Sequence, residues 1–247
     1  MDIISVLILF AIFLGGLVRT YFGFGEALVS MPLLTLIGLD IHTSVSVIGL
    51  AGILVASFNI FLDFKNIEYR LLAALLIGSF LGVPLGIWIL NFVNTSVVQW
   101  LLGLFLFSYG TYAFLRKVYF KNKTKMILKS KAWAGLTGII SGVLGSLYNS
   151  HGVPVVIYST LTGLSVKTLS STIQAHFLIT AILVVIGQDT GDIWTSATLP
   201  LFFLACPFLL ISVLIGKYCK RHTLDYHFDK WLYLFIAFLG LLLNFAH

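Results

Sequence analysis

Apolar residues occur along the chain in long blocks, and these blocks predict membrane-spanning helices. Most contain at least the ~18 residues that an α-helix needs to cross a bilayer. The clearest blocks cover residues 3–21, 43–62, 71–90, 96–115, 168–186 and 197–218.

Two segments break this pattern. The block at 3–21 passes through a glycine-rich break into a shorter apolar segment at 27–39. A dozen apolar residues make roughly 20 Å of helix, too short for a comfortable crossing. Residues 132–164 repeat the arrangement, so each half of the chain is expected to begin with a broken or re-entrant helical hairpin.

The two halves resemble each other in sequence. A constant offset pairs Gly23 with Gly145 and Pro32 with Pro154, and the spans follow in the same order. Internal repeats of this kind are common in secondary transporters. We therefore predict a first repeat at 1–116, a basic cytoplasmic linker at 117–131 and a second repeat at 132–247.

Composition and charge support a membrane protein and suggest its orientation. Of the 247 residues, 59% are hydrophobic and only 10% are charged, against about 25% charged in soluble domains. Nearly all Lys and Arg fall in the loops at 63–70, 116–131 and 217–230, which should face the cytoplasm. Equivalent spans then cross in opposite directions, and both termini face outward.

The predicted fold is therefore an all-α polytopic membrane protein built from two inverted repeats. Each repeat consists of one broken or re-entrant hairpin and three transmembrane helices. The lipid bilayer is the expected partner, in the inner (cytoplasmic) membrane of the cell. The sequence does not indicate an oligomeric state.

Several functional classes find no support in the sequence. The net charge of +6 lies in loops between spans and is no sign of nucleic-acid binding. No nucleotide-binding loop, Cys/His metal cluster or nucleophile elbow is present, which argues against a pump driven by ATP and against a hydrolase. We expect no cofactor, no metal and no enzymatic activity.

The first hairpin places charges within an apolar segment. Arg19 and Glu26 flank Gly23 and Gly25, and each charge at membrane depth costs roughly 2.5–3.5 kcal/mol. One interpretation is a structural ion pair that holds the hairpin closed. Another is that Arg19 binds an oxyanion, together with the two glycines and Ser30, while Glu26 carries a proton. A third interpretation is that the Arg19 side chain extends to a membrane interface. The sequence leaves all three open.

The second hairpin has no formal charge at the matching break but is rich in hydrogen-bond donors. Tyr148, Asn149, Ser150 and Gly152 are candidate anion ligands near the start of a helix. His151 is a candidate proton carrier. An equally weighted alternative is that these groups satisfy backbone exposed by the break.

Three polar residues inside spans are secondary candidates: Asn59, Gln174 and His176. A hydrogen bond between helices is the favoured role for each of them.

These features resemble the TauE/SafE-type sulfite exporter family, also called the toluene-sulfonate uptake permeases. Residues 23–27 (Gly-Phe-Gly-Glu-Ala) followed by 31–34 (Met-Pro-Leu-Leu) resemble the family's first glycine-rich hairpin, with Glu and Ala in place of two family glycines. Residues 151–158 (His-Gly-Val-Pro-Val-Val-Ile-Tyr) resemble its second copy, and 81–86 its third-span motif. The resemblance implies a permease for small anions, often sulfur oxyanions or organosulfonates.

The leading hypothesis is a secondary transporter for a small anion of the sulfite or sulfonate type, coupled to protons and possibly exporting. A passive anion channel or uniporter is the alternative within transport. A membrane-embedded enzyme using Glu26 and His151 is a weaker alternative from another class.

Overall fold

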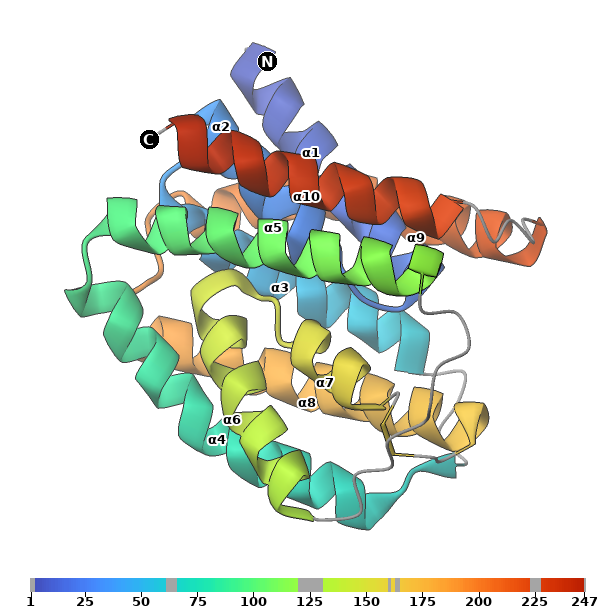
Figure 1. The fold of residues 1–247 in the computed structure, drawn as a ribbon. Helices are drawn as coiled ribbons and strands as arrows, with labels where there is room; N and C mark the ends of the chain where they lie inside the picture. The colour runs from blue at the N-terminus through green and yellow to red at the C-terminus, as the bar shows by residue number, and fades with distance from the viewer. Residues whose placement is uncertain are drawn as a thin grey trace.

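The computed structural model describes residues 3–60, 66–119, 131–159, 161–162, 165–222 and 228–246, which form helices and no strand. Figure 1 shows their arrangement. In chain order the helices are α1 (Ile3–Phe22), α2 (Glu26–Ile37), α3 (Ile41–Ile60), α4 (Tyr69–Phe92), α5 (Thr95–Tyr119), α6 (Lys131–Tyr148), α7 (Gly152–Ser159), α8 (Val166–Thr190), α9 (Thr198–His222) and α10 (Phe228–Ala246).

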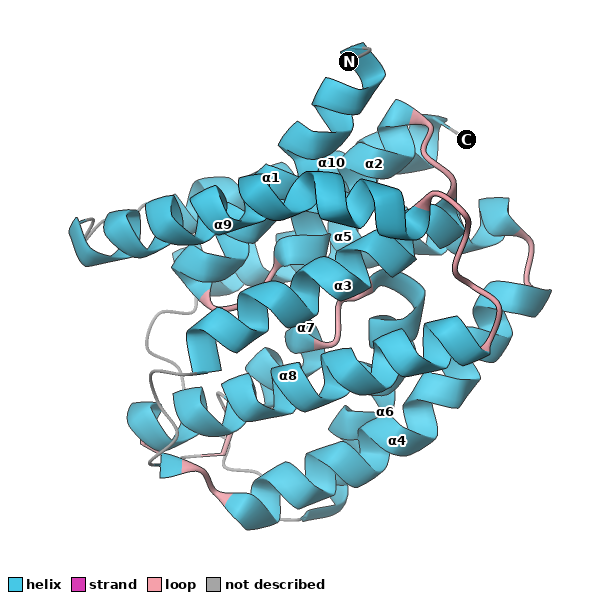
Figure 2. Cartoon of the chain, turned by 180° about the vertical axis from the view of Figure 1, so that it is seen from behind, coloured by secondary structure: helices cyan, strands magenta, loops and turns pink. Residues whose placement is uncertain are grey.

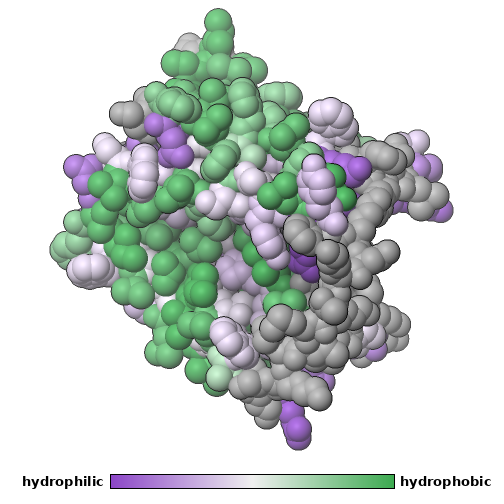
Figure 3. Space-filling view, viewed as in Figure 1, coloured by the Kyte–Doolittle hydropathy of each residue, from purple (hydrophilic) through white to green (hydrophobic). Residues whose placement is uncertain are grey.

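Six of these helices, α1, α3, α4, α5, α8 and α9, are long and apolar enough to cross a membrane. The surface carries many exposed large hydrophobic side chains, among them Phe80, Phe203 and Trp231. On the face shown in Figure 3, hydrophobic residues cover broad areas and the strongly hydrophilic ones lie mostly towards the edges. Such a surface suits contact with lipid tails, so the prediction of an all-α polytopic membrane protein is confirmed.

Each half of the chain begins with a helical hairpin. In the first, the Ser30 hydroxyl of α2 donates a hydrogen bond to the Ala11 carbonyl of α1 at 3.0 Å. In the second, the Ser141 hydroxyl of α6 donates to the His151 carbonyl at 2.7 Å. Three longer helices follow each hairpin, in the predicted order.

The halves pack reciprocally. α6 lies along α4, and α1 lies along α9, so each hairpin packs on the fourth helix of the other half. α3 packs against α8, and α5 against α10, as Figures 1 and 2 show from opposite sides. The contact between α4 and α6 is so close that a Cβ atom on Gly82 would lie 2.2 Å from the Ile139 carbonyl oxygen.

The bundle has two ends of different charge. At one, which we call the acidic end, the Asn91 side chain donates to the Gly191 carbonyl at 2.8 Å, and the hydroxyls of Thr43 and Thr195 lie 2.9 Å apart. The described residues at this end include the acidic side chains of Asp40, Asp189 and Asp192. They include no Lys or Arg.

At the other end, which we call the basic end, the Lys217 ammonium donates to the Phe58 carbonyl at 3.3 Å. The Glu68 amide donates to the Thr172 hydroxyl nearby at 2.9 Å. The described Lys and Arg side chains near the helix termini at this end are Arg70, Arg116, Lys117, Lys217, Lys220, Arg221 and Lys230.

Both chain termini belong to the acidic end. α1 runs parallel to α9, because Gly16 faces Ser212 and Gly216 faces Thr20. α10 runs antiparallel to α5 and finishes beside the start of α5 (Figure 1). Most of the expected linker at 117–131 lies outside the described residues, so the division into domains stays a prediction.

Candidate functional site

The tip of the first hairpin is a tight turn between α1 and α2. Gly23 and Gly25 have φ angles of 84° and 96°, in the left-handed region that side chains other than Gly rarely adopt. α2 then starts at Glu26 without a hydrogen bond from a capping side chain. The unsatisfied first amides of a helix attract negative charge, so this tip favours an anion.

Arg19 and Glu26 form a buried ion pair beside this turn. Arg19 Nη1 lies 3.3 Å from Glu26 Oε2, and the two residues are 4% and 3% exposed. Within the part of the chain that the structure describes, Arg19 Nε and Nη2 and Glu26 Oε1 are buried without a hydrogen-bond partner. Burying charges is costly unless their remaining donors and acceptors are satisfied. The pair therefore leaves two charged donors available to a further acceptor.

The tip of the second hairpin faces the first. Asn149 has a positive φ of 53° and donates its side-chain amide to the Val45 carbonyl of α3 at 2.5 Å. The Ser150 hydroxyl donates to the Tyr148 carbonyl at 3.3 Å. His151 is buried, its Nδ1 atom has no partner, and α7 begins directly after it at Gly152.

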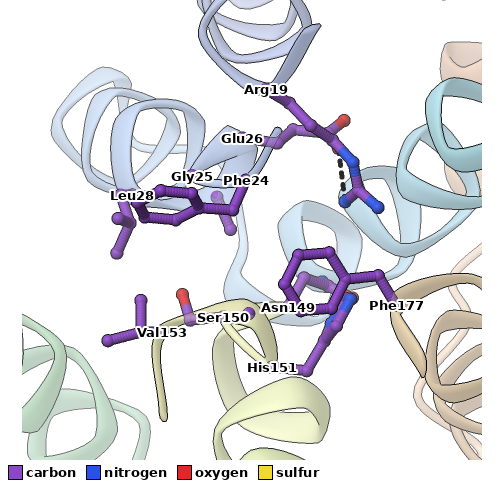
Figure 4. A pocket seen from close by; sticks show the side chains of 12 residues that line it. Arg19, Phe24, Gly25, Glu26, Leu28, Asn149, Ser150, His151, Val153 and Phe177 are labelled. Atoms are coloured by element: carbon purple, nitrogen blue, oxygen red, sulfur yellow. Dashed lines mark hydrogen bonds and ion pairs between the residues drawn. The ribbon is translucent and has the colours of Figure 1, made fainter. Parts of the chain in front are cut away.

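A small cavity lies between the two tips (Figure 4). Its free space is about 10 Å³, roughly enough for one water molecule. In this conformation the cavity is therefore too small for an anion of several heavy atoms. It is lined by Arg19, Phe24, Gly25, Glu26, Ala27, Leu28, Asn149, Ser150, His151, Gly152, Val153 and Phe177.

The structure thus brings together seven of the residues proposed from the sequence. Arg19, Gly25 and Glu26 come from the first hairpin, and the rest from residues 149–152 of the second. Segments more than a hundred residues apart in sequence meet at one cavity, as the hypothesis of two converging hairpins requires.

Three further candidates lie next to the cavity but do not line it. Ser30 bonds the Ala11 carbonyl within the first hairpin, and Gly23 forms the turn. The Tyr148 hydroxyl donates to the Val98 carbonyl at 2.8 Å, and its ring stacks on Phe105. The contacts of these residues hold the hairpins in place.

The secondary candidates link helices. The Gln174 side chain on α8 donates to the Gly23 carbonyl at 3.0 Å. His176 Nε2 lies 3.0 Å from the Ser79 hydroxyl of α4, which is the hydrogen bond between helices that the sequence favoured. Asn59 belongs to α3, but its side chain lies outside the described part of the chain.

Outside the two hairpins, two residues near the site were missed by sequence reasoning. Phe177 of α8 lines the cavity, and its ring centroid is 6.0 Å from Arg19 Cζ. Gly52 of α3 lies beside the ion pair, since a Cβ there would be 3.5 Å from Arg19 Nη1. A phenylalanine or glycine in an apolar span carries no signal of its own. The only indication was that Phe177 follows the polar pair Gln174 and His176.

The described residues contain no group of three or more His, Cys, Asp or Glu side chains placed to hold a metal ion. The polar side chains that line the cavity are instead a guanidinium, a carboxylate, an amide, a hydroxyl and an imidazole, from Arg19, Glu26, Asn149, Ser150 and His151. This set can bind a small anion through charge-assisted hydrogen bonds.

Comparison with known proteins identifies the family. The family model described as sulfite exporter TauE/SafE matches residues 8–243. Searches of curated proteins and of solved structures found no match. The family match spans both hairpins and all the long apolar helices. The chain therefore belongs to the TauE/SafE sulfite exporter family of multi-pass membrane transporters.

Proposed function

We propose that this transporter is a secondary permease for a small anion of the sulfite or sulfonate type, working in the inner membrane of the cell. The observation that carries the proposal is the buried Arg19 guanidinium, which has two nitrogen atoms without a partner among the described residues, beside a small cavity. The start of α2 and the donors at 149–152 add positive potential and hydrogen bonds at the same place. The family's description supports this substrate class and an exporting direction.

Coupling to protons follows from competition for Arg19. A bound anion and the Glu26 carboxylate would need the same guanidinium, which lies 3.3 Å from Glu26. Protonation of Glu26 frees Arg19 to bind the anion, and loss of the proton restores the ion pair and expels the substrate. Only a difference in anion affinity between the two protonation states is needed. His151 is the second candidate proton carrier.

We further propose that the two halves are inverted repeats that move relative to one another. In support, α3 runs from the acidic end to the basic end while its counterpart α8 runs the other way, and the hairpins pack reciprocally. A cavity of about 10 Å³ does not hold an anion with several heavy atoms. Transport then requires the hairpin tips to separate, as in transporters with broken helices.

The test is anion affinity, measured over about pH 5–8 in purified protein with a small sulfonate, whose charge does not change in this range. Sulfite, which itself binds a proton in this range, is compared between variants at a single pH. We expect wild-type affinity to fall as pH rises, and Glu26→Gln to bind with little dependence on pH. Arg19→Ala should lose binding. The double variant Arg19→Ala/Glu26→Gln, which has no charge at either position, should also fail to bind and serves if the single variant does not fold.

Each outcome has a defined meaning. Unchanged affinity in both Arg19 variants would remove Arg19 from the site. If the affinity of Glu26→Gln depends on pH as that of the wild type does, another group carries the proton, and His151→Gln is tested next. Counterflow in proteoliposomes then separates mechanisms, because a carrier exchanges labelled substrate whereas a channel does not and an enzyme alters it chemically.

A further inference from the structure

We propose that the side chain of Phe177 is the gate that closes the cavity towards the basic end. Among the residues that line the cavity, Phe177 alone comes from a helix outside the two hairpins. Figure 4 shows its ring on the side opposite Phe24 and Leu28, next to Arg19 and His151. The proposal rests on the proposed function only in taking this cavity as the place that the anion reaches.

The ring of Phe177 joins the two hairpin tips. It is 1% exposed, and its centroid lies 6.0 Å from Arg19 Cζ and 5.5 Å from the His151 ring, which meets it edge-on. A Cβ on Gly152 would lie 3.0 Å from Phe177 Cζ, so the ring covers the start of α7. One side chain thus spans the gap between the ion pair and the donors of the second tip.

The surroundings of Phe177 show which end it closes. It belongs to a small apolar cluster with Leu75, Ala134, Val155 and Tyr158, separate from the main core. Leu75 and Ala134 lie in the first two turns of α4 and α6, and Tyr158 in the last turn of α7. The start of α4 lies at the basic end, and α6 runs parallel to α4. The cluster therefore fills the space between the cavity and the basic end.

Rotation of this ring is a small movement with a large effect on access. A phenylalanine side chain occupies one of a few staggered rotamers. The ring is held by packing against the hairpin tips and its apolar cluster. In the proposal, a change of rotamer with a small shift of these neighbours opens a path from the basic end to Arg19.

The experiment measures access to the cavity from each side of the membrane. Ser150, which lines the cavity, is replaced by Cys in a protein whose Cys206 and Cys219 are changed to Ser. A membrane-impermeant methanethiosulfonate reagent is applied to inside-out and right-side-out vesicles. Phe177→Ala and Phe177→Leu are compared with Tyr109→Ala, which removes a ring of the main core that meets Tyr233 edge-on and does not line the cavity.

In Phe177→Ala we expect the cysteine to be modified on the order of tenfold faster, and from the basic end only. This factor is about what one edge-on aromatic pair contributes to the equilibrium between the closed and open positions of the ring. Phe177→Leu should give a smaller rise in the modification rate on the same side. If the alanine variant does not fold, the leucine variant alone tests the proposal. Tyr109→Ala should leave both rates unchanged. Equal rates in wild type and both Phe177 variants would overturn the proposal, and so would a rise from the acidic end or an equal rise in Tyr109→Ala. Because labelling involves no transported anion, its result is independent of the affinity test of Arg19.

Discussion

Arg19 holds its position in the bundle through one contact of 3.3 Å to Glu26 and a ring face of Phe177. A guanidinium has five N–H donors, and here most of them are buried without an acceptor. If the ion pair served only stability, we would expect carbonyl groups or a second carboxylate to accept hydrogen bonds from these donors. The incomplete pairing favours the functional interpretation of Arg19 over a purely structural ion pair.

The ion pair makes a prediction about stability. Arg19→Ala leaves the Glu26 carboxylate buried and unpaired, and removing one partner of a buried pair costs about 3–5 kcal/mol. The melting temperature of the purified protein should therefore drop clearly. In Arg19→Ala/Glu26→Gln no charge is left uncompensated, so part of the loss should return. A double variant no more stable than the single one would show that Glu26 is not charged in the folded protein.

Ser30 provides a contrasting prediction. Its hydroxyl donates to Ala11 within the first hairpin and does not line the cavity. Ser30→Ala should lower stability by about 1 kcal/mol, the usual value of one hydrogen bond, and leave anion affinity unchanged. Thermal unfolding and binding, measured on the same sample, test both parts. A loss of affinity without a loss of stability would show that Ser30 contributes to substrate binding after all.

How far the site could be predicted depends on how each residue differs from its neighbours. Arg19 and Glu26 stand out because a charge in an apolar block is costly and needs a reason. Phe177 is one of 21 phenylalanines, and only its place after Gln174 and His176 distinguishes it from those that face lipid. Gly52 is similar, because its importance comes from a neighbour, Arg19, that only the fold brings close.

At the scale of helices, the pair α4 and α6 is set apart by glycines. Cβ atoms on Gly78 and Gly82 would overlap backbone carbonyls of α6, so the two helices touch along their backbones. Small residues permit this approach between helices in membranes. The positions of the helices were predictable, because bilayer thickness sets their length. Their partners were not, because an apolar face can pack on a helix or on lipid equally well.

This contact yields a matched pair of variants. Gly82→Ala places a methyl group 2.2 Å from the Ile139 carbonyl and should force α4 and α6 apart, which lowers the melting temperature. Gly135→Ala, on α6 itself, meets nothing within 4 Å. It should be neutral or stabilising by up to about 1 kcal/mol, since Ala favours a helix over Gly. Equal effects of the two changes would contradict the close contact.

At the scale of the whole molecule, the separation of charge predicts an orientation. The basic end should face the cytoplasm, because Lys and Arg are retained on that side. Single cysteines at Asn94, an exposed residue of the acidic end, and at Lys220, an exposed residue of the basic end, report on it. In a background without Cys206 and Cys219, an impermeant reagent added to intact cells should label Asn94→Cys and not Lys220→Cys. The reverse pattern would invert the topology.

The reciprocal packing of the two halves also sets an order of assembly during synthesis. α6 emerges when its partner α4 is already in the membrane, whereas α1 must wait for α9, made near the end of the chain. Until then the nascent hairpin that carries Arg19 and Glu26 lacks the helix that it packs along. Contacts between distant parts of a chain form late and slowly. Phe177 on α8 also comes from the second half, so the surroundings of the first hairpin are completed late in synthesis.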